Sequence, residues 1–215
     1  MATTMGKEPG ATVILVHGLW GTDLGLRRLG RGIARAGMGV GYYRYASWRD
    51  SLEKSATGLR EVIRRSPGVT VHLLGHSMGG IVIAKMLEGG TPPGVWKVAF
   101  LGCPIRGSAV IAALCGNRVG RFLVGQAARE GIVEKRPAPP VDRPLLVVAG
   151  TFPLGIGLLF RLPRPNDGWI RVSETQVEGA RTILSGAWHF GLLLSRKVAD
   201  GVCAFFQGEP GRTGG

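Results

Sequence analysis

The sequence has no apolar run of the roughly 18 residues that a membrane-spanning helix needs. Its first residues, MATTMGKEPGAT, contain one lysine and no apolar segment, so they do not resemble a signal peptide. We therefore expect a cytoplasmic protein, with peripheral attachment at a membrane as the alternative.

Cysteine is scarce as well. The three cysteines, Cys103, Cys115 and Cys203, form no C-x-x-C pair and have no ligand-like spacing to histidine. An odd number of widely spaced cysteines favours reduced structural thiols over disulfides or a metal site. No metal ion and no cofactor is expected.

Acidic residues are few, with 14 Asp and Glu against 27 Lys and Arg, and the formal net charge is +13. A basic protein attracts anions, which makes an anionic lipid surface or an acidic carrier protein a candidate partner. The arginines are spread over many segments, and no basic patch is interleaved with aromatic residues. This distribution argues against nucleic-acid binding.

What the chain does contain is an alternation of strand-like and helix-like segments. Strands are expected at Thr12–Val16, Val40–Tyr45, Val69–Leu74, Val95–Leu101, Pro144–Ala149 and Arg181–Leu184. Helices are expected at Leu24–Ala36, Ser51–Arg65, Met78–Leu87, Ala109–Leu114, Val119–Ala128 and Phe190–Phe206. Continuously apolar strands such as VILV and LLVV are typical of a sheet covered on both faces. The pattern predicts an α/β fold, a mostly parallel sheet of about six strands with helices on both faces.

The length of 215 residues suits one domain, which we place at 11–206 between flexible ends at 1–10 and 207–215. Two segments, 103–143 and 151–166, interrupt the alternation, and long excursions of this kind are often lids or pocket loops. The second contains the apolar run LGIGLLF. That run is expected to line an acyl site or to enter a membrane surface, and the alternative is a helix buried against the core.

The strongest motif is GHSMGG, which follows the strand VTVHLL and opens the helix IVIAKML. This is G-x-S-x-G in the strand–turn–helix context of a nucleophile elbow. Ser77 is therefore the candidate nucleophile, and the backbone N–H of Met78, at the helix N-terminus, is a candidate oxyanion donor. The alternative is a glycine-rich turn with an inactive serine. His76 occupies a variable position of the motif and is assigned to packing.

A second oxyanion donor is expected in HGLWG, which follows the first strand. Gly18 allows the backbone to turn and present the N–H of Leu19. An ordinary turn at the end of a strand is the alternative.

The base must follow Ser77 in the chain if the order is serine, acid, histidine. His189 is the one histidine beyond Ser77, just before the last helix. Asp167 lies in PNDG after the fifth strand, where Gly168 provides a tight turn, and it is the preferred orienting acid. Glu174 is the second choice, because it lies on the same return path to the sheet.

These residues stand in VILVHGLWG, LLGHSMGG, LGCPIRGS, VVAGTF and PNDGWIRVSET. Together the motifs resemble the small bacterial lipase and esterase group of α/β-hydrolases, including relatives of GPI inositol-deacylase domains. The resemblance implies a minimal α/β-hydrolase fold and cofactor-free ester hydrolysis. It carries the triad and oxyanion roles onto the residues already chosen. Trp169-Ile170 and Cys103-Pro104 depart from the usual pattern, and both departures are expected to reshape the pocket.

The predicted function is therefore a serine esterase that acts on a small-molecule ester with an apolar or acyl group. Pocket walls are expected from Trp20, Phe152, Leu154 and Trp188, because they stand in the loops at the predicted catalytic edge. A thioesterase or acyltransferase on the same triad remains an alternative, as does a non-catalytic ligand-binding module with this fold.

Overall fold

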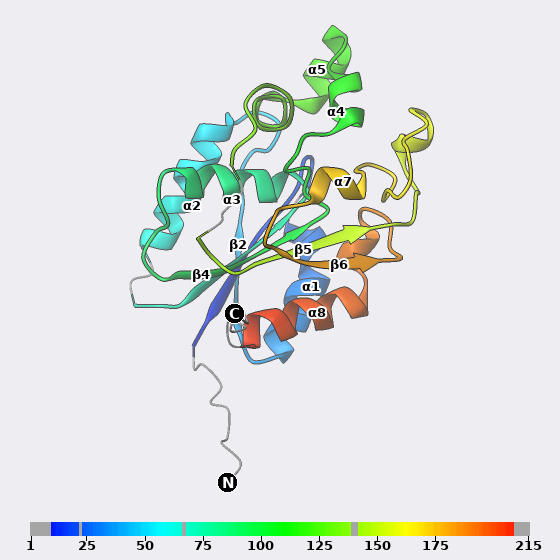
Figure 1. The fold of residues 1–215 in the computed structure, drawn as a ribbon. Helices are drawn as coiled ribbons and strands as arrows, with labels where there is room; N and C mark the ends of the chain where they lie inside the picture. The colour runs from blue at the N-terminus through cyan, green and yellow to red at the C-terminus, as the bar shows by residue number, and fades with distance from the viewer. Residues whose placement is uncertain (1–9, 22, 66–67, 139–141, 209–215) are drawn as a thin grey trace.

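The computed structural model describes residues 10–21, 23–65, 68–138 and 142–208. Six strands form one parallel sheet in the order β2-β1-β3-β4-β5-β6, which confirms the predicted architecture (Figure 1). The strands are β1 (Thr12–Val16), β2 (Gly39–Tyr43), β3 (Val71–His76), β4 (Val95–Leu101), β5 (Leu145–Gly150) and β6 (Arg181–Ser185). The chain runs outward from β1 to β2 and then returns to β3, so β1 and β3 flank a switch point. Ligands of open α/β sheets bind at the carboxyl ends of the strands beside such a point.

Each face of the sheet has its own helical layer (Figure 1). The longer helices are α1 (Asp23–Arg35), α2 (Leu52–Arg64), α3 (Met78–Glu88) and α8 (Arg196–Gln207). One core joins α1 and α8 to the strand residues Val13 and Leu15, and the other joins α2 and α3 to Ile14 and Val16. Because side chains alternate across a strand, the continuously apolar run of β1 fills both cores.

Two predicted helices are wrong in detail. The segment 119–128 divides at Gly125, whose φ of 77° ends a helix, and the chain continues as short helical pieces. These pieces are α4 (Ala109–Leu114), α5 (Arg118–Val124), α6 (Gln126–Ala128) and the π-helix η1 (Arg129–Glu134). The last helix begins only at Arg196, because the Ser195 side chain caps it and the 3-10 turn η3 (Gly191–Leu193) precedes it.

The segment 151–166 is not a helix buried against the core. It contains only the 3-10 turn η2 (Ile156–Leu158), followed by exposed apolar side chains, and the short helix α7 (Val172–Thr175) comes after it. Most of the two ends that we expected to be flexible lies outside the described residues. Within the residues that are described, no helix has the length and apolar character needed to cross a bilayer.

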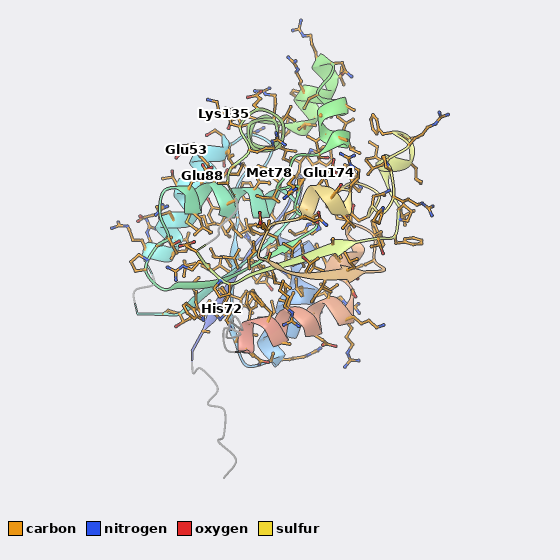
Figure 2. The ribbon with its side chains drawn as sticks, viewed as in Figure 1. Glu53, His72, Met78, Glu88, Lys135 and Glu174 are labelled. Atoms are coloured by element: carbon orange, nitrogen blue, oxygen red, sulfur yellow. The ribbon has the colours of Figure 1, made fainter. Side chains whose placement is uncertain are left out.

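A buried histidine joins the sheet to the last helix. His72 of β3 stacks on Phe206 of α8, with ring centroids 4.9 Å apart, and lies on the sheet face that α8 covers (Figure 2). Burial lowers the pKa of His72 from 6.5 to about 4, and the nearby Lys97 ammonium adds to the effect. Lys97 itself donates to the carbonyl groups of Phe205 and Phe206 at the end of α8, each at 3.1 Å.

This neutral histidine predicts a loss of stability in acid. The pKa is lower in the folded than in the unfolded chain, so the unfolded chain takes up the proton first as the pH falls below 6.5. The contribution of His72 to the free energy of unfolding is therefore complete above that pH and is lost toward pH 4. We expect a slope of about 1.4 kcal/mol per pH unit at most. The free energy of unfolding, measured with urea at several pH values in this range, should fall less steeply with decreasing pH for His72→Gln than for the wild type. An equal dependence on pH in the two proteins would contradict the assignment.

Candidate active site

Ser77 lies at the sharp turn between β3 and α3. Its φ of 54° and ψ of −123° lie in a region that residues with a side chain rarely occupy, and its N–H donates to the Leu101 carbonyl at 2.9 Å. Met78 is the first residue of α3, so its N–H has no partner one turn earlier in the helix. The turn thus presents a hydroxyl and a backbone donor together at the helix N-terminus, where the potential is positive.

The turn requires glycine on both sides of the serine. A Cβ on Gly75 would overlap the backbone of Gly80, and a Cβ on Gly79 would overlap the Val16 carbonyl. The two glycines let β3 and α3 approach each other and let α3 touch the end of β1. The motif therefore reflects close packing as well as chemistry.

The loop after β1 lies directly against this turn. A Cβ built on Gly18 would stand 2.9 Å from the Cβ of Ser77. The Tyr45 hydroxyl donates to the His17 carbonyl at 2.9 Å, and the Gly21 N–H donates to the Gly18 carbonyl at 3.1 Å. Leu19 follows these two carbonyl groups, inside the turn that the bond between Gly21 and Gly18 closes, and it lines the same cavity as Ser77. The structure thus places both predicted oxyanion residues beside the serine.

Asp167 and His189 meet as a buried pair. The ring Nδ1 of His189 donates to Asp167 Oδ2 at 2.7 Å, and the backbone N–H of His189 donates to the Asp167 carbonyl at 2.9 Å. Exposed fractions of only 1% for Asp167 and 3% for His189 keep water away from this contact. Donation by Nδ1 leaves Nε2 as the basic nitrogen of the ring.

The carboxylate of Asp167 is held from its other side by the turn that follows it. Asp167 Oδ1 accepts the N–H groups of Trp169 at 2.9 Å and Ile170 at 2.7 Å. Gly168 makes this turn possible with a φ of 92°, which a side chain would oppose. The Asp167 carboxylate is thus held by the turn as well as by its contact with His189.

Glu174, the alternative acid, has a different role. Its Oε1 accepts the Ala109 N–H at 2.7 Å and a guanidinium N–H of Arg171 at 2.9 Å, and its Oε2 accepts the Arg171 backbone N–H at 2.8 Å. These bonds cap both α7 and α4, so Glu174 joins the N-terminal ends of the two helices. Figure 2 shows Glu174 on the α7 ribbon. Between the two candidate acids, the structure joins Asp167 to the histidine.

His76 does more than the packing role assigned to it. Its Nε2 donates to the carbonyl of His189 at 3.1 Å, and its ring lies 4.8 Å from the ring of His189. Burial lowers the pKa of His76 to about 3, so the ring is neutral at ordinary pH. Because a backbone carbonyl accepts this bond, Nε2 carries the proton. His76 therefore links the serine turn to the segment that carries His189.

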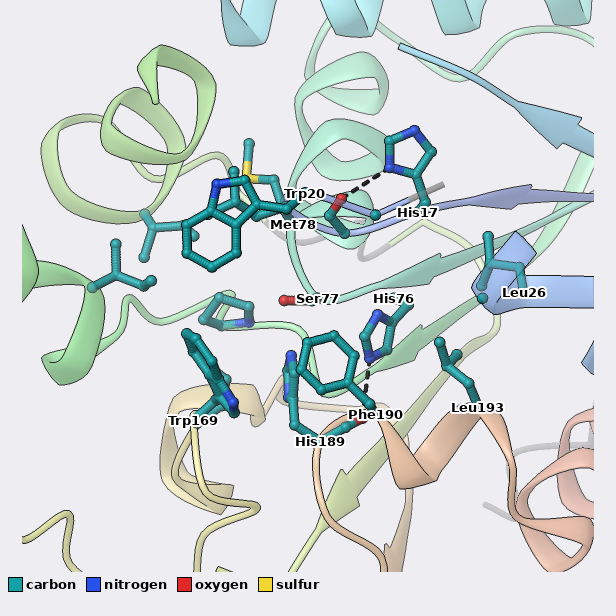
Figure 3. Close-up of a pocket in the computed structure, with 18 of the residues that line it drawn as sticks. His17, Trp20, Leu26, His76, Ser77, Met78, Trp169, His189, Phe190 and Leu193 are labelled. Carbon is teal, nitrogen blue, oxygen red and sulfur yellow. Dashed lines mark hydrogen bonds between the residues drawn. The ribbon is translucent and has the colours of Figure 1, made fainter. Parts of the chain in front are cut away.

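A cavity of about 370 Å³ joins these groups. Ser77 and His189 both line it, and in Figure 3 the imidazole of His189 points toward the Ser77 hydroxyl. The walls are mostly apolar. They include Leu19, Trp20, Pro104, Ile111, Trp169 and Ile170. The cavity thus offers an apolar site with a few polar groups gathered at one point, as small-molecule sites do.

The predicted pocket walls need correction. Trp20 lines the cavity, whereas Phe152, Leu154 and Trp188 do not. Phe152 and Leu154 are 53% and 48% exposed, and Trp188 packs on Phe190 with ring centroids 5.6 Å apart.

The side chains that take their place are Trp169 and Ile170. The turn at Gly168 brings them to the cavity directly after the acid. The sequence feature that could have identified them is their position two and three residues after Asp167, where the sequence departs from the usual family pattern.

No family model matches the chain, and no curated protein matches it. Among solved structures, the mature lipase BlEst2 of Bacillus licheniformis has a TM-score of 0.76 at 17% identity, over 91% of this chain and 93% of that chain. A metagenomic carboxyl esterase, MGS0156, has a TM-score of 0.64 at 16% identity, over 85% of this chain and 65% of that chain. An extracellular α/β-hydrolase of a Paenibacillus species has a TM-score of 0.58 at 16% identity, over 93% and 100%. These likenesses establish the α/β-hydrolase fold; the relation to GPI inositol-deacylase domains stays a prediction.

Proposed function

We propose that this protein is a serine hydrolase that cleaves carboxylic esters with an apolar acyl or alcohol group. One arrangement carries the proposal: Ser77, strained at a strand-to-helix turn, shares a cavity with His189, whose Nδ1 is held by Asp167 at 2.7 Å. Nucleophile, base and orienting acid in series are what acyl transfer from an ester requires.

In this mechanism Ser77 Oγ attacks the ester carbonyl carbon while His189 Nε2 takes the hydroxyl proton. The oxyanion is bound by the backbone N–H groups of Leu19 and Met78, each worth about 10²–10³ in rate. His189 then donates the proton to the leaving alcohol, and an acyl-enzyme forms on Ser77. Water activated by His189 attacks this acyl group and releases the acid.

The substrate class follows from the walls of the cavity. Most of the side chains around Ser77 are apolar, so transfer of an apolar substituent of the ester from water into the cavity is favourable. The lipase and the carboxyl esterase among the structural neighbours support the same class of substrate. Thioesters fit the same geometry, and rates on matched oxygen and sulfur esters separate the two.

A fluorophosphonate probe tests the proposal, because it reacts with a serine only where a base and an oxyanion site activate it. We expect one adduct per chain, found by mass spectrometry on the peptide that contains Ser77. Ser108, which caps α4, serves as an internal control and should stay unmodified. A folded protein that gains no adduct would refute the proposal in favour of a non-catalytic ligand-binding module.

A further inference from the structure

Helix α5 exposes apolar side chains although it is firmly attached. Val119 and Phe122 are 69% and 63% exposed. Two indole groups hold the helix from beneath: Trp20 Nε1 donates to the Leu123 carbonyl at 2.9 Å, and Trp48 Nε1 donates to the Phe122 carbonyl at 2.7 Å. The helix is therefore fixed to the rest of the domain, and its apolar outer side chains are exposed to water.

The loop after β5 shows the same combination. Leu158, Leu159 and Phe160 are 59%, 82% and 40% exposed. At the base of this loop, the Gly157 N–H donates to the Gly168 carbonyl at 2.7 Å. Figure 1 shows the loop, in yellow, and α5, in green, as two projections from the body of the molecule. Large apolar side chains held out in this way often mark an interaction surface.

Two tryptophans connect the projections across the cavity. Trp20, bonded to α5, lies edge to face with Trp169 at 6.2 Å between ring centroids. Trp169 lies against the loop, since a Cβ on Gly155 would stand 2.8 Å from its ring. Both tryptophans line the cavity that holds Ser77 (Figure 3). We use the name apolar rim for Val119, Phe122, Leu123, Leu158, Leu159 and Phe160.

The two segments that carry the apolar rim contain charged residues of one sign only. The segment 109–125 contains Arg118 and Arg121, the segment 151–166 contains Arg161 and Arg164, and neither contains an acidic residue. All four arginines are exposed, whereas the acidic residues that next follow the two segments, Glu130 and Asp167, are half-buried and buried. The outward surface here combines apolar side chains with positive charge.

We propose that the apolar rim docks on an anionic lipid surface. Apolar side chains enter the acyl boundary while arginines bind lipid phosphates, and tryptophan favours the same interfacial depth. A second copy of this chain is a poorer partner, because it would place four arginines against four others. Docking would set the cavity mouth at the lipid. That consequence rests on the proposed esterase function, whereas the binding itself does not.

Sedimentation with vesicles tests the binding without requiring catalysis. Vesicles of phosphatidylcholine, with or without about a third of phosphatidylglycerol, are mixed with the full chain. The apolar variant is Phe122→Ser with Leu159→Ser, and the charge variant is Arg118→Gln with Arg161→Gln. Their matched controls are Val62→Ser with Leu184→Ser, exposed on α2 and β6, and Arg28→Gln with Arg31→Gln, exposed on α1. The two arginine pairs lower the net charge equally, and thermal melts verify folding of every variant.

We expect wild-type protein to bind the anionic vesicles at least about tenfold more tightly than the neutral ones. The apolar variant should lose more than about tenfold in affinity for the anionic vesicles, and the charge variant roughly 30-fold. Both controls should stay within about twofold of wild type.

Three results would overturn the proposal. The first is no sedimentation with either kind of vesicle. The second is equal loss in the two arginine pairs, which would mean attraction by net charge alone. The third is a wild-type protein that forms a concentration-dependent dimer and does not bind vesicles, together with an apolar variant that stays monomeric. Absence of fluorophosphonate labelling would instead refute the esterase proposal and leave the binding result unaffected.

Discussion

Replacing Ser77 with alanine is expected to lower kcat/KM on a short p-nitrophenyl ester by about 10⁴–10⁶-fold. Without the hydroxyl no acyl-enzyme can form, and the oxyanion donors with the apolar cavity can support only a slow attack by water. Because the side chain is small and lies at the turn itself, the fold should survive. Steady-state rates on the purified variant, with a thermal melt beside them, give the measurement.

A matched substitution separates this effect from a loss of structure. Ser51 caps α2 by accepting the Lys54 N–H at 3.1 Å, and it does not line the cavity. Ser51→Ala removes the same atom and should cost about 1 kcal/mol of stability with little change in kcat/KM. A Ser77→Ala protein that keeps more than about a hundredth of wild-type activity would exclude Ser77 as the nucleophile.

The serine turn could be predicted from the sequence because its geometry is local. Gly75, Ser77 and Gly79 must stand at these spacings for a strand and a helix to meet so closely, and that requirement is visible in a short window of sequence. The same holds for the parallel sheet, since continuously apolar strands alternating with helices permit few arrangements. The choice of His189 rested on the expected chain order of serine, acid and histidine.

The cavity walls were harder to predict, because they depend on distant contacts. Phe152 and Trp169 are both large aromatic residues in loops after β5. Trp169 lines the cavity, in a turn that is held by the hydrogen bonds of Asp167, and Phe152 does not. Those bonds form in three dimensions around a buried carboxylate. Hydrophobicity cannot distinguish a side chain that lines a pocket from one that stands in water.

The role of His76 also depends on a contact between distant residues, which the sequence could not predict. Its place in the motif carries no fixed chemistry, and only the folded chain brings its Nε2 to the carbonyl of His189, 113 positions away. Between them, His76 and Asp167 hold the His189 backbone and ring from two directions. We infer that His189, the proposed base, is positioned by its surroundings before any substrate binds.

Replacing Asp167 with asparagine is expected to lower kcat by about 10³–10⁴-fold while the fold persists. The amide oxygen can still accept the N–H groups of Trp169 and Ile170, so the turn stays supported. The amide nitrogen would then face Nδ1 of His189 and donate to it, which moves the ring proton to Nε2. A ring with a proton on Nε2 cannot accept one from Ser77.

Glu174→Gln is the matched control, because it makes the same chemical change in a second buried carboxylate of the same segment. Glu174 bonds backbone and guanidinium N–H groups around α4 and α7 and does not line the cavity, so this variant should lose stability but keep kcat within a fewfold of wild type. Rates and thermal melts of both variants distinguish the two effects. The opposite result would be a loss of activity in Glu174→Gln at unchanged stability, with activity retained in Asp167→Asn. Catalysis would then depend on the carboxylate that does not contact His189. That result would show that the hydrogen bond between Asp167 and His189 does not activate the serine.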